Sequence, residues 1–181
     1  IYGVAPNQLW LRLMIAALVT GVAALAVPQV LGVGYDTVDS ALLGDLPVII
    51  LLAACLFKLL TSATSVAMGM PIGLIGPTLF IGATAGGLVA VVANYIDADL
   101  SSPAFYVMLG MGAMMGAVLQ APLAALMAVM EMTHNPNIIL PAMLVIIIAN
   151  VTASEVFGLK SVFMTQMDMM GIEFRQNPLS M

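Results

Sequence analysis

The chain has 181 residues, of which 62% are hydrophobic and only 7% are charged, and its formal net charge is −5. Soluble globular domains carry about 25% charged residues, so these proportions exclude a water-soluble domain. They predict an all-α integral membrane protein that crosses a plasma or bacterial inner membrane several times and is surrounded by lipid. Four basic residues cannot form the positive patch that phosphates require, which excludes a nucleic-acid partner. The single cysteine, Cys55, excludes a disulfide framework.

Long apolar runs predict the helices in chain order. Trp10 and Arg12 precede the first run as interfacial anchors, and Pro28 with two nearby glycines predicts that this helix ends before Tyr35. A short polar-flanked piece is expected at 36–43. The longer predicted segments are 13–34, 46–68, 75–96, 103–119, 122–132 and 138–153. Several are too short for a full crossing, which takes ~20 helical residues, and such partial helices are typical of transporters with a site at the midplane.

The most informative segment is Gly73-Leu74-Ile75-Gly76-Pro77. It interrupts residues 59–96, which contain no charged side chain and are too numerous for one straight crossing. We expect one helix to stop before this segment and a new one to start at Ile75. A helix that starts at membrane depth presents unpaired N–H groups and the positive end of its dipole. The break therefore predicts an anion site made by backbone amides without a cation.

Lys58 lies inside the second long helix and has two interpretations. A lysine within a membrane span is by default a candidate functional residue. Its long stem can also carry the ammonium group to an interface, or the charge can form a structural ion pair. We favour snorkelling or an ion pair, because Lys58 lies well along the helix from Asp45.

Other chemistry is not indicated by the sequence. The sixteen methionines are scattered and are interpreted as packing rather than as copper ligands. His134 is the only histidine and is expected in a loop, and no metalloprotease, GxSxG or Walker sequence occurs. We therefore expect no enzymatic activity, no metal and no cofactor. Glycines four residues apart, at 82 and 86 and at 112 and 116, are interpreted as helix-packing contacts.

Several motifs occur in an order that points to one family. The segment Gly73–Pro77 resembles a GxFxP sequence in the second half of that family's transmembrane domain. The other motifs are Leu31-Gly32-Val33-Gly34-Tyr35-Asp36, Leu79-Phe80-Ile81-Gly82-Ala83, Met111-Gly112-Ala113, Ala121-Pro122-Leu123, Glu131-Met132-Thr133, Ile139-Leu140-Pro141 and Gly158-Leu159-Lys160-Ser161-Val162-Phe163. Through their shared order the chain resembles the CLC family of voltage-gated chloride channels and chloride/proton antiporters.

The resemblance implies a fold and a set of partners. Residues 1–170 would be the C-terminal half of the CLC transmembrane domain, one half of an inverted-repeat fold with tilted, partial and broken helices, plus its final helix. Residues 171–181 would start a cytoplasmic tail. The partners implied are chloride as the substrate, with no cofactor, the N-terminal half of the same domain, and a second subunit in a homodimer. Segments 122–132 and 138–153 would form part of the dimer surface.

The resemblance also implies which residues hold the anion. The amides of Leu74 and Ile75 would bind it, with Gly73 allowing close approach and with Gly76 and Pro77 in the first helical turn. Phe163 stands where the family has a central tyrosine whose hydroxyl contacts the anion. Phenylalanine has no hydroxyl, and one neutral hydrogen bond contributes about 0.5–1.5 kcal/mol. We therefore expect anion binding weaker by up to roughly tenfold, and looser proton coupling that favours channel behaviour.

Two functions remain as alternatives. The leading one is chloride transport, as a channel or a chloride/proton antiporter, with the anion at the start of the helix after Gly73–Pro77. The other is a non-conducting structural or assembly module in the membrane. The break separates them, because a scaffold does not need an unpaired helix start at membrane depth. The isolated chain is expected not to conduct, since the other half of the pore wall would be missing.

Overall fold

A computed structural model describes residues 9–68, 70, 73–96, 102–133 and 136–169. These residues form α-helices joined by short connections, which confirms the predicted all-α class. The helices are α1 Leu9–Ala26, α2 Tyr35–Leu43, α3 Val48–Ala67, α4 Ile75–Ile96, α5 Pro103–Leu119, α6 Pro122–Thr133, α7 Ile139–Val151 and α8 Val162–Met169. Short 3₁₀ turns at Pro28–Val30 and Pro136–Ile138 and a π-helical turn at Thr152–Val156 complete the described elements. His134 and residues 171–181 lie outside the described residues.

Helix boundaries follow the local chemistry of the chain. α4 and α5 begin and end at the predicted residues, and α5 starts with proline at its first turn, where the missing N–H has no intrahelical partner in any case. The first helix ends at Ala26, earlier than the predicted segment 13–34. Val27 precedes Pro28 and is extended, with φ −138° and ψ 90°, as expected for a residue whose α conformation is disfavoured by a following proline.

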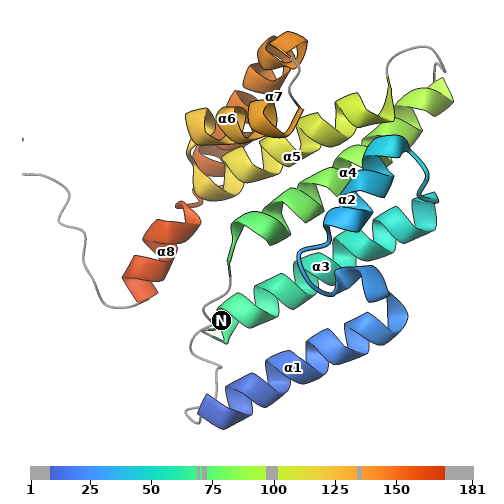
Figure 1. Ribbon diagram of the computed structural model, residues 1–181. Coiled ribbons are helices and arrows are strands. Elements are labelled where there is room, and N and C mark those ends of the chain that lie inside the picture. Colours follow the sequence, from blue (N-terminus) through green and yellow to red (C-terminus); the bar gives the residue numbers. More distant parts are fainter. Residues whose placement is uncertain (1–8, 69, 71–72, 97–101, 134–135, 170–181) are drawn as a thin grey trace, which may run out of the picture.

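The helices are arranged in layers around α4 and α5 (Figure 1). α3 and α4 run antiparallel as neighbours, and α4 packs along α5. α1 covers the outer side of α3, whereas α6 and α7 pack on the opposite side against α5. The last helix, α8, lies at the end of the bundle where α4 begins (Figure 1). This arrangement brings the start of α4 to the same end as Phe163.

Glycines allow the two central helices to approach closely. A Cβ atom on Gly82 would lie 2.8 Å from Met111 Cα, and one on Gly86 would lie 2.8 Å from Val107 Cα. Gly112 and Gly116 face the side chain of Ile146 in α7. Real Cβ contacts essentially never occur below 3.0 Å, so α4 and α5 can hold this distance only with glycine at these positions. The predicted packing role of both glycine pairs is confirmed.

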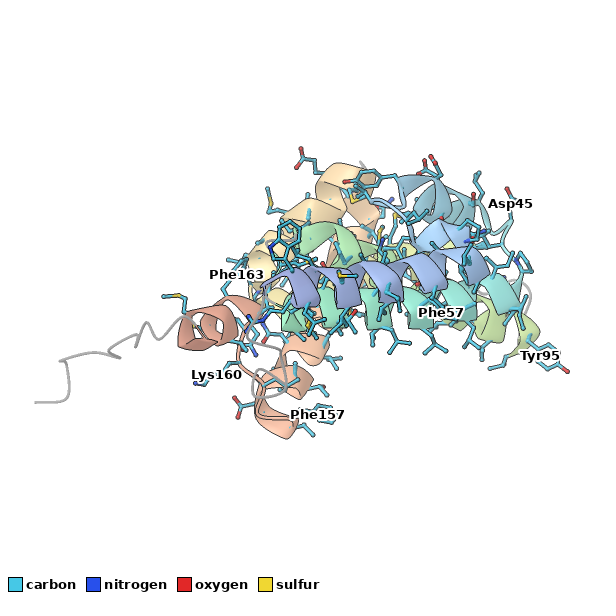
Figure 2. The ribbon with its side chains drawn as sticks, turned by 90° about the horizontal axis from the view of Figure 1, so that it is seen from below. Asp45, Phe57, Tyr95, Phe157, Lys160 and Phe163 are labelled. Carbon is cyan, nitrogen blue, oxygen red and sulfur yellow. The ribbon has the colours of Figure 1, made fainter. Side chains whose placement is uncertain are left out.

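The outer surface is apolar over the length of the helices. Three described segments are long and apolar enough to cross a membrane, namely Val48–Ala67, Ile75–Ile96 and Pro136–Val156. Large side chains such as Leu56, Val92 and Ile148 are exposed on them. Tyr95, which is 93% exposed, and Asp45 mark one end of the bundle, opposite Lys160 and Phe163 (Figure 2). An apolar belt between such ends is the surface expected of an integral membrane protein.

Candidate functional site: the start of α4 and the cleft beside it

The predicted break in the long uncharged run is present. α3 ends at Ala67, where the Met68 amide donates to Thr64 O at 2.9 Å, and α4 does not begin until Ile75. Residues 69, 71 and 72 are not described, but Gly73 and Leu74 are non-helical. The Thr78 amide donates to Leu74 O at 3.2 Å and closes the first turn of α4. Amides ahead of Thr78 have no acceptor within the helix, and Pro77 has no N–H.

A cleft of about 470 Å³ opens beside this helix start. Gly73, Ile75, Gly76 and Pro77 line it, so four of the six predicted site residues share one cavity. We call it the polar cleft because five hydroxyl-bearing side chains and one lysine also line it. Those polar side chains are Thr20, Tyr35, Lys58, Thr61, Ser62 and Ser65.

The wall that α3 contributes is a stripe of polar residues on one helical face. Lys58, Thr61 and Ser65 follow one another at spacings of three and four, which places them on one side of a helix. Thr61 Oγ1 donates to Lys58 O at 3.1 Å, and Ser65 Oγ donates to Thr61 O at 2.8 Å. Their hydroxyl protons are thus used within α3, whereas their oxygen lone pairs remain available. Polar groups in a membrane helix usually face a protein interior or a water-filled cavity, and this stripe does so.

Lys58 does not snorkel, and the favoured interpretation from sequence is wrong. Its side chain is only 4% exposed. The ammonium nitrogen donates to Val30 O at 2.8 Å and to Gly32 O at 2.7 Å, and it lies 4.9 Å from the centroid of the Phe80 ring. The partners that the structure gives it are carbonyl oxygens and an aromatic face rather than a carboxylate. Lys58 therefore ties the connection between α1 and α2 to α3.

That connection in turn packs on the first turns of α4. A Cβ on Gly76 would lie 3.2 Å from Val33 Cγ1. Gly34 has φ +79°, and a Cβ there would collide with the Phe80 ring. Only glycine combines this left-handed backbone with so close an approach. The segment 30–34 is thus held by Lys58 on one side and by the start of α4 on the other.

The remaining two predicted residues lie elsewhere. Leu74 lines a neighbouring apolar cleft of about 370 Å³ that shares Ser62 and Pro77 with the polar cleft. Phe163 is the second residue of α8, is 52% exposed, and lines neither of these two clefts. The structure brings α8 to the same end of the bundle but does not place the Phe163 ring against the Gly73–Pro77 segment.

The start of α8 is held by a serine cap. The Met164 amide donates to Ser161 Oγ at 3.3 Å, and the Thr165 amide donates to Ser161 O at 3.0 Å. A serine hydroxyl that accepts from an amide of the first turn is a common N-cap arrangement. Phe163 therefore projects from an ordered first turn rather than from a loop.

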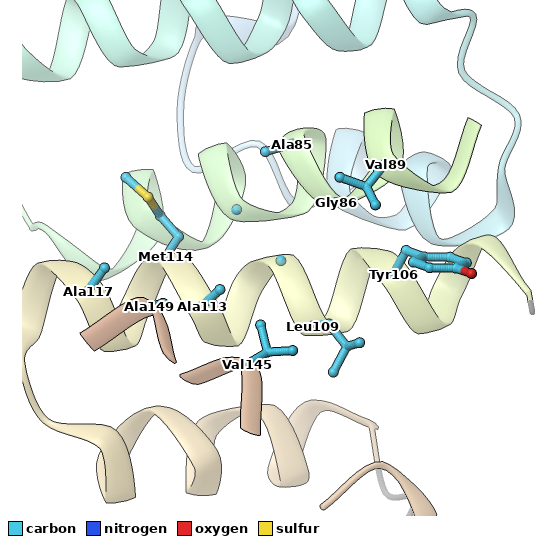
Figure 3. A pocket seen from close by; sticks show the side chains of 12 residues that line it. Ala85, Gly86, Val89, Tyr106, Leu109, Ala113, Met114, Ala117, Val145 and Ala149 are labelled. Atoms are coloured by element: carbon cyan, nitrogen blue, oxygen red, sulfur yellow. The ribbon is translucent and has the colours of Figure 1, made fainter. Parts of the chain in front are cut away.

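A further cavity lies between α4, α5 and α7 and is almost purely apolar (Figure 3). Its volume is about 440 Å³, and Val89, Leu109 and Val145 contribute aliphatic walls. Tyr106 supplies its one titratable side chain. This cavity has no convergent polar groups and carries no chemistry. Among the described residues, no three His, Cys, Asp or Glu side chains gather into a metal site.

Known proteins resemble the chain over most of its length. Residues 3–154 match the protein family described as "Voltage gated chloride channel". A putative chloride channel protein, ClcB-like, of Ralstonia nicotianae is 34% identical over 79% of this chain and 34% of its own length. The H(+)/Cl(−) exchange transporters ClcA of Vibrio vulnificus and Klebsiella pneumoniae are 28% and 30% identical over 79% and 77% of this chain. The chain spans about a third of the length of these relatives. With its motifs, its broken helix and the family match in agreement, the chain belongs to the voltage-gated chloride channel family.

Proposed function

We propose that this chain takes part in the passage of chloride across a membrane and that the anion binds at the start of α4. The observation that carries the proposal is the interruption between α3 and α4, which starts a new helix beside a polar cleft. The first amides of that helix have no acceptor within it. The family relatives named as chloride channels and H(+)/Cl(−) exchange transporters support chloride as the substrate.

Backbone amides suit an anion that has to leave again. The start of a helix carries roughly +0.5 of an elementary charge, which favours an anion without holding it as a fixed cation at contact would. The predicted site had no cation, but Lys58 lines the same cleft, where its ammonium group donates to the Val30 and Gly32 carbonyls. Conduction requires binding that is strong enough for entry and weak enough for exit. We assign the contacts to the amides of Leu74 and Ile75, with Gly73 leaving room for the ion. A Cβ on Gly73 would meet no described atom within 4 Å, so packing among the described residues does not account for glycine there.

The proposed partners complete a pore that the described residues line on one side. They are the N-terminal half of the same transmembrane domain, which would cover the polar cleft, and a second subunit in a homodimer. The exposed apolar residues Leu123 and Met127 of α6 and Leu144 and Ile148 of α7 suit such a dimer contact. The alternative is a non-conducting assembly module. It does not explain why the polar stripe of α3 lines the same cleft as the start of α4.

Gly73→Leu is expected to abolish chloride uptake without unfolding the protein. We expect the leucine side chain to block access to the Leu74 and Ile75 amides, and its Cβ would meet no described atom within 4 Å. Uptake of isotopic chloride into liposomes that contain the full-length protein would measure this, with Gly21→Leu on the open face of α1 as the matched control. Equal uptake by the Gly73→Leu and unaltered proteins would contradict the site assignment.

Phe163 predicts loose coupling between chloride and protons. Without a phenolic hydroxyl, the anion loses one donor worth about 0.5–1.5 kcal/mol, and a less occupied central site would let chloride pass without a proton. Proton flux and chloride flux would be measured in parallel in liposomes. We expect more chloride ions to move per proton than in an exchanger with a fixed chloride-to-proton ratio. Exchange at one constant ratio across chloride gradients would refute this expectation.

A further inference from the structure

A strained residue at the end of α5 is tied to the segment that leads into α8. Gln120 caps α5 with φ 51° and ψ 38°, the one described non-glycine residue with positive φ. Its amide donates to Gly116 O at 3.0 Å. Its side-chain Nε2 donates to the carbonyl oxygen of Leu159, which is 39 residues away in the chain.

The left-handed conformation at a helix end is normally given to glycine or asparagine. A glutamine there is disfavoured, so its presence calls for a separate reason. The Leu159 carbonyl does not need Gln120 as its hydrogen-bond donor. Leu159 is 59% exposed, so another donor could take the place of the glutamine side chain. What the bond adds is a fixed position for the Leu159 peptide.

The preceding peptide group, which carries the Leu159 amide, is held as well. The Leu159 amide donates to Ala153 O at 3.0 Å, across the π-helical turn Thr152–Val156 and past Gly158, whose φ is +60°. Both polar groups of Leu159 are therefore engaged. Two residues later, Ser161 caps α8, and Val162 packs against the core. Phe163 follows directly.

We propose that Gln120 is a positioning residue for Phe163, acting through the Leu159 carbonyl. This inference rests on the proposed function, with residue 163 beside the transported anion as the family resemblance implies. In the structure the Phe163 ring lines neither cleft at the start of α4, so its position depends on how α8 is held. The Gln120–Leu159 bond would set where the first turn of α8 stands relative to the body of the protein. Gln120 itself would not touch the anion.

The test uses two variants that separate the effect of losing the Gln120–Leu159 bond from the effect of the backbone strain at residue 120. Gln120→Asn tolerates the left-handed backbone but is one methylene too short to reach Leu159. Gln120→Gly removes the strain and the bond together. With Cys55→Ala and with any further cysteine of the full-length protein replaced, a nitroxide attached at Phe163→Cys reports the motion of α8. We expect its spectrum to show greater mobility in both Gln120 variants than with Gln120 present, and an unchanged spectrum would overturn the proposal.

A double-mutant cycle supplies the functional readout. Phe163→Tyr restores a hydroxyl and is expected to tighten chloride binding by roughly two- to tenfold, measured by calorimetry. With Gln120→Asn this gain should disappear, because the hydroxyl would no longer be held in place. A gain of equal size in both backgrounds would overturn the positioning role even if thermal stability fell. If the unaltered protein bound no chloride, the proposed function would fail, and the nitroxide spectra alone would decide the role of Gln120.

Discussion

Gly86→Leu is expected to prevent the protein from folding, and Gly86→Ala to lower its unfolding free energy by about 1–3 kcal/mol. Even the single methyl group of alanine would lie 2.8 Å from Val107 Cα. Backbone atoms cannot rotate away as a side chain can, so α4 and α5 would have to separate. That movement would disturb the contacts around Phe80 and Met111, which are both almost fully buried. Thermal unfolding of the purified protein in detergent would measure the loss.

Gly21→Ala is the matched control for that experiment. Gly21 also lies within an apolar helix, but a Cβ there would meet nothing within 4 Å. Because alanine favours a helix over glycine by about 1 kcal/mol, this substitution should leave the melting temperature unchanged or raise it slightly. If both alanine variants melted at the same temperature, the close approach of α4 and α5 would not be what holds the bundle together.

Lys58→Met should lower chloride uptake roughly tenfold or more while lowering stability by only about 1–2 kcal/mol. Methionine fills a similar space but leaves the buried Val30 carbonyl without its donor, which costs about 1–3 kcal/mol. Methionine also removes the desolvation cost of the buried ammonium group, which offsets part of that loss. The transport defect is expected to exceed the stability defect because segment 30–34 would lose its attachment above the first turn of α4.

Two variants sharpen this test. Lys58→Arg keeps a donor for both carbonyls and should restore most of the uptake, whereas Leu60→Met changes an exposed position of the same helix and should have no effect. Uptake and melting temperature would be measured together in liposomes and detergent. Normal uptake by Lys58→Met would show that the lysine has no part in shaping the polar cleft.

Helix boundaries were predictable where the chain carries strong local signals. Pro103 and Pro122 open helices at their first turns, and the Gly73–Pro77 segment separates α3 from α4. α8 was expected only from the resemblance, because residues 155–181 mix polar and apolar residues without a clear period. Pro28 and the glycines after it correctly predicted that the first helix ends before Tyr35. Its exact end at Ala26 was not predicted, because uncharged residues continue to Gly34.

For the candidate site, the position of the helix start was predictable from sequence, but the side chains around it were not. Gly73 and Pro77 mark the helix start by their own conformational preferences. The partners of Lys58 come from a connection 26 and 28 residues earlier in the chain, and no local pattern indicates such a pairing. Thr61 and Ser65 were overlooked, although their spacing from Lys58 in an otherwise apolar helix was a readable signal of a polar face.

The proposed function depends on a halide that binds to the backbone amides where α4 starts. The most direct test is an experimental structure of the full-length protein in bromide, with the anomalous scattering of the ion used to locate it. We predict a bromide peak within hydrogen-bonding distance of the amide nitrogens of Leu74 and Ile75. Bromide bound elsewhere in the pore, with no peak at these two nitrogens, would contradict the account.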